Sequence, residues 1–286
     1  MNKKNDFSQK MHSYLRHPAS LIMMILVKLA ALITFTVLIF LIVYILVHGV
    51  PYLKPSLFSL HYNSENASLM PALINTVVMT LLSLLLAVPI GIFSAIFLAE
   101  YAGKGNKFVD IIRLTTETLS GIPSIVYGLF GMLFFVSTCH WGFSLLAGAF
   151  TLAIMILPLI MRTTEEALLS VPDSYREGSF GLGAGKLRTV FYIVLPSAVP
   201  GILAGVILAI GRIVGETAAL IYTAGSVAQV PSSVLGSGRT LAVHMYLLAS
   251  EGLYMDQAYA TAVILLVLVV VINTLSGMVA KKLTKV

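Results

Sequence analysis

The chain has 286 residues, of which 58% are hydrophobic and only 10% are charged. Soluble domains carry about 25% charged residues, so this composition excludes an ordinary soluble protein. The net charge of +6 would suggest a nucleic-acid partner in a soluble chain. In a membrane protein, basic cytoplasmic loops explain such a charge better, and we expect no nucleic-acid partner.

Six long apolar stretches predict an all-α membrane protein with six transmembrane helices. A helix needs about 20 residues to cross a hydrocarbon core of about 30 Å. The predicted helices, in chain order, are 21–48, 72–98, 114–138, 143–161, 198–223 and 259–280. The predicted organisation is a cytoplasmic tail (1–20), a first helix (21–48), a transmembrane domain (70–280) and a second cytoplasmic tail (281–286).

The basic residues divide unevenly between the two sides of the membrane. With the N-terminus inside, 14 of the 18 fall in the two tails and in the loops 100–113 and 162–188. Only Lys54 and Arg239 fall on the other side. Cytoplasmic loops carry the excess of Lys and Arg, so both termini and the loop 162–188 are predicted to be cytoplasmic. The external segments 49–71 and 224–258 are expected to carry short re-entrant or interfacial structure.

Two apparent sites in the sequence are not supported. The stretch GLGAGKLRT resembles a phosphate-binding loop, but Phe180 and Leu187 stand where that motif needs glycine and Ser or Thr. We therefore expect this chain not to bind ATP and to carry no cofactor. The histidines do not have zinc-ligand spacing, and the single cysteine, Cys139, excludes an internal disulfide, so no metal site is predicted.

The cytoplasmic loop carries a pattern spread over 20 residues. From Glu177 the chain reads EGSFGLGAGKLRTVFYIVLP. This resembles the EAA loop, E-A-A-x3-G-x9-I-x-L-P, of ABC importer permeases, although Gly178 and Ser179 replace the two alanines. The matching positions are Glu177, Gly183, Ile193, Leu195 and Pro196.

Local sequence predicts a helix–turn–helix in this coupling loop, 162–196. Ser170 to Asp173 has the spacing of a helix start, and the glycines between 181 and 185 would end that first helix. A second short helix is expected from Lys186 to Ile193. The family resemblance implies that this element docks on an ATPase subunit and transmits its movement to the membrane helices.

Four sequence segments resemble those of PstA-type permeases of phosphate-specific ABC importers. They are FLAEYAGKG (97–105), SGIPSIVYGLFG (120–131), RTTEEALLSVPDSYREGSFGLGAGK (162–186) and RIVGETAALIYTAG (212–225). The resemblance implies a non-catalytic, multi-pass subunit of the bacterial or archaeal plasma (inner) membrane. Its implied partners are a second homologous permease, two ATP-binding subunits, an extracytoplasmic phosphate-binding protein, inorganic phosphate and membrane lipid. A sister PstC-type permease, or a permease for another oxyanion, remains an alternative.

Two charged residues stand in the apolar stretch 198–223. On a continuous helix, Arg212 and Glu216 fall within about 60° of Gly201 and Gly205, on the face of small residues. One interpretation is a structural ion pair. The other is that Arg212 binds phosphate oxygens in the substrate pathway, with Glu216 as its counter-charge or as a gate.

A third charged residue, Glu117, lies near a membrane boundary. It has either a pathway and gating role or only a local structural one. Gly121 and Pro123, which follow it, are expected to break or kink its helix.

Two other functional classes fit the sequence less well. An ion-coupled secondary phosphate transporter would often show an inverted repeat, which the sequence does not display, and it would leave the EAA-like loop unexplained. An intramembrane enzyme would need a metal-binding histidine pair or a nucleophile and base at motif spacing, and the chain lacks both.

Overall fold

The computed structural model describes residues 18–102 and 105–284. These residues form helices and loops, without a strand among them. Five helices are long and apolar enough to cross a membrane, and a bent helix pair would make a sixth span. The all-α membrane fold is therefore confirmed. Residues 1–17 of the N-terminal tail and residues 285–286 of the C-terminal tail lie outside the described part.

The helices occupy most of the described chain. In order they are α2 (Pro18–Gly49), α3 (Met70–Ile96), α4 (Lys107–Ser120), α5 (Ser124–Gly131), α6 (Leu145–Leu169), α7 (Asp173–Gly181), α8 (Lys186–Thr189), α9 (Leu195–Val214), α10 (Ala218–Ile221), α11 (Leu241–Glu251) and α12 (Met255–Thr284). Wider π-helical turns extend three of them, at Phe97–Tyr101, Met132–Thr138 and Val190–Val194.

The core forms where α6 packs between α3 and α9. Met79 of α3 and Leu152 and Ile156 of α6 are completely buried in it. Small residues let the helices approach closely, as expected in a membrane: a side chain on Gly201 of α9 would collide with Ala167 of α6. This confirms that the small-residue face of residues 201–205 packs against protein.

The predicted span 114–138 is not a single straight helix. The chain breaks between Ser120 and Ser124, and the axes on the two sides differ by 101°. Pro123 cannot donate a backbone hydrogen bond, and the residue before a proline avoids the helical conformation, so the helix cannot continue through this point. The break expected at Gly121 and Pro123 is confirmed, and the two helices together can form the predicted span.

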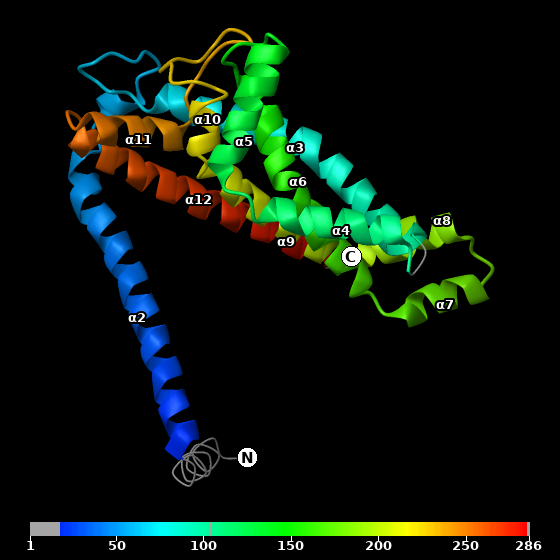
Figure 1. Ribbon diagram of the computed structural model, residues 1–286. Helices are drawn as coiled ribbons and strands as arrows, with labels where there is room; N and C mark the ends of the chain where they lie inside the picture. The colour runs from blue at the N-terminus through cyan, green and yellow to red at the C-terminus, as the bar shows by residue number, and fades with distance from the viewer. Residues whose placement is uncertain (1–17, 103–104, 285–286) are drawn as a thin grey trace.

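Helix α2 extends away from the other helices (Figure 1). It touches α12 only near its C-terminal end, where Gly49 packs against the backbone of Tyr259. Most of its remaining apolar side chains are exposed. An apolar helix exposed on all sides is typical of one surrounded by lipid or by the helices of another subunit.

Candidate functional site

The coupling loop contains the two predicted short helices, at one end of the bundle (Figure 1). The predicted cap at Ser170 is wrong, because Ser170 ends α6 and α7 begins after Pro172 without a side-chain cap. Helix α7 ends at Gly181, and Gly183 then adopts φ +82°, a left-handed conformation that favours glycine. The hydroxyl groups of Ser179 and Thr189 are 2.8 Å apart and buried, which joins α7 to α8. Ser179 replaces an alanine of the EAA pattern, and its hydroxyl group has this structural use.

The outer surface of this element is strongly apolar. Leu182, Leu187 and Tyr192 are 91%, 67% and 77% exposed. Glu177 is also exposed, on α7. Exposed apolar patches with polar edges are typical of protein–protein contact sites. We define Tyr175–Tyr192 as the coupling tip.

The other residues of the EAA-like pattern follow the tip in the chain, and Ile193 still lines a small pocket together with Gly183. Ile193 is half-buried in the π-helical turn that leads into α9. Leu195 and Pro196 form the first turn of α9. The pattern therefore marks two places: Glu177 and Gly183 lie at the exposed tip, and the remaining three residues connect it to a membrane helix.

Two glycine substitutions in the coupling tip should have opposite effects. A Cβ atom would meet nothing within 4 Å at Gly183 or at Gly178. Gly183→Ala forces alanine into a left-handed conformation, which costs about 1–2 kcal/mol. Gly178→Ala lies inside α7 and should stabilise that helix by about 1 kcal/mol.

The measurement is retention, during purification, of the ATPase subunit that the family resemblance implies. Gly183→Ala should lower retention, and Gly178→Ala, the matched control, should maintain or raise it. Equal retention in both variants would show that the turn conformation does not matter for docking.

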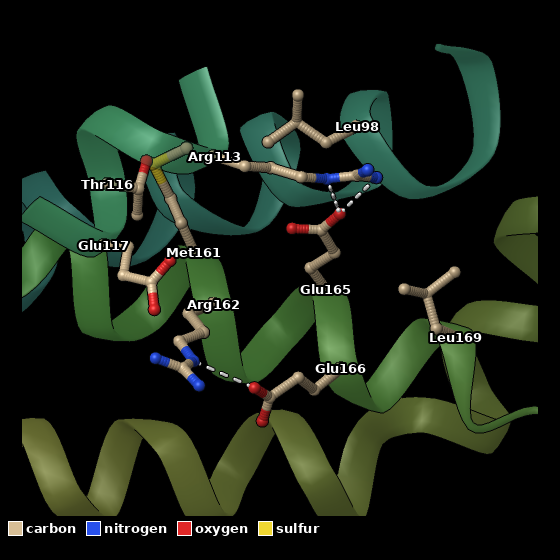
Figure 2. Close-up of a pocket in the computed structure, with 9 residues that line it drawn as sticks. All are labelled: Leu98, Arg113, Thr116, Glu117, Met161, Arg162, Glu165, Glu166 and Leu169. Atoms are coloured by element: carbon tan, nitrogen blue, oxygen red, sulfur yellow. Dashed lines mark hydrogen bonds and ion pairs between the residues drawn. The ribbon is translucent and has the colours of Figure 1, made fainter. Parts of the chain in front are cut away.

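A charged cleft of about 320 Å³ lies between α4 and α6 (Figure 2). Arg113 binds Glu165 through two nitrogen atoms, at 2.8 and 2.7 Å. Arg162 binds Glu166 at 2.9 Å. Glu117 also projects into this cleft (Figure 2). Carboxylates outnumber guanidinium groups by three to two, so the cleft as it stands does not favour a free anion.

The four cleft residues around Glu117 were not recognised in the sequence. They are Arg113, Arg162, Glu165 and Glu166. The i,i+4 spacing of Arg162 and Glu166 at the end of an apolar stretch was a usable signal. The pairing of Arg113 with Glu165 joins residues 52 positions apart, and local spacing could not reveal it.

The prediction of one continuous helix over 198–223 is wrong. Helix α9 ends at Val214, and α10 begins at Ala218. Glu216 is buried and accepts a hydrogen bond from the backbone N–H of Ala219 at 3.1 Å. By accepting from a free N–H at the start of α10, the Glu216 carboxylate stabilises the beginning of a new helix after α9 ends. Glu216 therefore does not lie on the α9 face that carries Arg212.

The predicted ion pair between Arg212 and Glu216 is accordingly absent from the described part of the chain. Arg212 lies in the last turn of α9, and Glu216 lies beside the first turn of α10. Each charge therefore has the sign that the neighbouring helix end favours. Arg212 has no hydrogen-bonded partner among the described residues, so its guanidinium group remains free to bind an anion.

Arg212 lies where two interrupted helices meet. It is within electrostatic reach of the Tyr127 hydroxyl group, which donates a hydrogen bond of 2.7 Å to the carbonyl of Leu119. Gly128 of α5 packs directly on the backbone of Ala219. We call residues 119–128 and 212–219 the broken-helix junction. Interrupted membrane helices at such points expose backbone groups that can line a polar passage.

The three residues assigned to the substrate pathway thus fall at two places. Arg212 and Glu216 belong to the broken-helix junction, and Glu117 belongs to the charged cleft. No hydrogen bond or ion pair in the described chain joins Glu117 to the other two. Their roles in transport stay predictions.

The chain is similar to a family of transport proteins and to several of its members. Residues 87–285 match the family described as binding-protein-dependent transport system inner membrane component. The probable ABC transporter permease protein YqgI of Bacillus subtilis is 35% identical over 278 residues, covering 90% of this chain and 94% of the relative. The phosphate transport system permease protein PstA of Haemophilus influenzae is 39% identical over 178 residues, or 62% of each chain. PstA 1 of Mycobacterium tuberculosis is 35% identical, covering 73% of this chain and 69% of the relative.

Solved structures share the fold at low sequence identity. A subunit of a bacterial alginate ABC importer aligns with a TM-score of 0.67 at 17% identity, covering 96% of this chain and 99% of that one. A chain of the MetNI methionine transporter aligns with a TM-score of 0.62 at 22% identity, covering 76% of this chain and 96% of that one. At these identities the likeness shows the fold alone.

Proposed function

Because this chain belongs to the family of binding-protein-dependent transport system inner membrane components, we propose that it is one of two permease subunits of an ATP-driven importer for inorganic phosphate. The relatives named PstA confirm the resemblance to that permease type. They are also the observation that carries the phosphate assignment. The guanidinium group of Arg212 at the broken-helix junction has no hydrogen-bonded partner among the described residues, which supports an anion as substrate.

The proposed complex contains four further subunits. Two ATP-binding subunits would dock on coupling tips, a second homologous permease would complete the passage, and an extracytoplasmic phosphate-binding protein would deliver the substrate. This chain would hydrolyse nothing itself. The exposed leucines and tyrosine of the coupling tip support such a docking role.

The proposal is tested with the complete complex reconstituted in vesicles. We expect phosphate uptake that needs ATP and the binding protein, and that continues when proton and sodium gradients are collapsed. Uptake driven by an ion gradient without ATP would instead support a secondary transporter. Preferential uptake of sulfate or another oxyanion would reject the phosphate assignment.

We also propose that the coupling tip and both termini are cytoplasmic. With Cys139 replaced by serine, a cysteine at Leu182 should react with an impermeant thiol reagent only after the membrane is opened. A cysteine at Leu60, which is 62% exposed in the external segment, should react in intact cells and is the matched control. Labelling of the Leu182 position in intact cells would reverse the topology.

A further inference from the structure

Helices α7 and α8 together form the coupling element. A buried ion pair holds this element to the end of α3. Arg176 of α7 donates to Glu100 through Nη2 at 2.6 Å and through Nε at 3.2 Å. The two side chains are 15% and 7% exposed. The hydrogen bond to Glu100 raises the pKa of the Arg176 guanidinium group, so that group stays charged. Two donors on one carboxylate hold the pair in a fixed orientation.

Arg176 also fixes the end of α6. It donates to the carbonyl of Leu168 at 2.9 Å and to that of Val171 at 2.8 Å. One guanidinium group thus joins α7 to α3 and to α6. Removing either partner of such a buried pair leaves an uncompensated charge, whereas exposed pairs such as Arg162–Glu166 contribute little.

A second contact reaches the neighbouring residue of the same turn. The Nζ atom of Lys186 in α8 lies 5.0 Å from the centre of the Tyr101 ring, a distance suited to a cation–π interaction. Both short helices of the coupling element therefore hold the π-helical turn Phe97–Tyr101. Single π-helical turns occur often at functional positions. We call Glu100, Tyr101, Arg176 and Lys186 the α3 clamp.

The opposite end of α3 is tied to the segment 226–240, which precedes α11. The amide of Asn75 donates to the carbonyl of Gln229 at 2.9 Å and to that of Arg239 at 3.2 Å. Thr76 accepts from the backbone N–H of Leu241 at 2.8 Å. Both side chains are buried. Figure 1 shows α11 and the coupling element near opposite ends of the bundle, with α3 running between them.

We propose that Glu100 and Arg176 are positioning residues, which hold α7 and α8 to α3 so that α3 couples movements at the segment 226–240 to the ATPase subunits. The inference rests on the proposed function. A 27-residue helix spans about 40 Å, so it reaches across the membrane. Pro89 interrupts the hydrogen bonds inside this helix, but α6 supports α3 on both sides of it, at Ala87 and at Gly91, which packs on Ile160.

The test measures ATP hydrolysis by the reconstituted complex, with and without the phosphate-loaded binding protein. Glu100→Gln should keep basal hydrolysis and lower the stimulation by the binding protein about tenfold. Asp173 is the other carboxylate beside Arg176, and its side chain is 87% exposed. Asp173→Asn should therefore retain most of the stimulation. Full stimulation in Glu100→Gln would overturn the proposal.

The exposed half of the clamp gives a second test if Glu100→Gln does not assemble. Tyr101→Leu removes the ring and should lower stimulation about two- to fivefold, whereas Tyr101→Phe keeps the ring and should behave as the parent does. Equal stimulation of ATP hydrolysis in Tyr101→Leu and Tyr101→Phe would overturn the proposed role of α3. If a binding protein loaded with a different solute, rather than with phosphate, stimulates ATP hydrolysis by the parent complex, the phosphate assignment fails. Comparing the stimulation in the variants with that in the parent complex still tests the role of α3.

Discussion

Replacing Arg212 by glutamine should abolish phosphate uptake in a complex that still assembles. The guanidinium group is half-buried at the broken-helix junction and has no hydrogen-bonded partner among the described residues, so its removal breaks no internal ion pair. Arg212→Lys keeps the charge but loses the planar fork that binds two phosphate oxygens, and should lose about 90% of uptake. Uptake is measured beside the recovery of all subunits.

Glu216→Gln is the control for the charge at this junction. Its amide oxygen can still accept the hydrogen bond from Ala219, so the start of α10 should be maintained. If Glu216 only supports α10, this variant should transport phosphate nearly as the parent does. If its charge gates the passage, transport should change although assembly does not. Substantial uptake by Arg212→Gln would show that Arg212 does not carry the anion.

Replacing Leu182 by aspartate should release the ATPase subunit or uncouple hydrolysis from transport. Leu182 is 91% exposed at the point of the coupling tip where α7 turns toward α8. If it inserts into an apolar site on the ATPase, burying an unpaired carboxylate there would cost several kcal/mol and weaken docking by more than 100-fold. Glu177→Lys should weaken docking less, because that position is an exposed polar edge.

Leu253→Asp is a matched control for this substitution. Leu253 is 80% exposed but lies between α11 and α12, away from the coupling tip. Retention of the ATPase subunit is measured by its recovery with each variant. Equal retention in Leu182→Asp and Leu253→Asp would contradict the docking assignment.

Much of the fold could be predicted because its causes are local. The length of an apolar stretch decides whether a helix can span a membrane, and five of the six predicted stretches contain long apolar helices. Pro123 breaks a helix wherever it occurs, since it lacks a backbone donor. Gly183 likewise marks the turn between α7 and α8, because few other residues adopt its conformation.

The partners of the charged residues could not be predicted in this way. Helical periodicity placed Arg212 and Glu216 on one face, but the backbone of Ala219 competes for the Glu216 carboxylate and α9 ends before it. Glu100 and Arg176 are 76 residues apart and meet only because α7 folds back beneath α3.

Hydropathy, proline and glycine act within a few residues of their own positions, so the chain alone predicts a membrane protein, its approximate helices and the helix–turn–helix of the coupling loop. The end of α9, the lack of a hydrogen-bonded partner for Arg212 among the described residues and the hold of α7 and α8 on α3 become visible only in the folded molecule. A buried charge is stabilised by whichever hydrogen-bonding groups surround it in space. Those groups are set by the packing of helices that are distant in the chain.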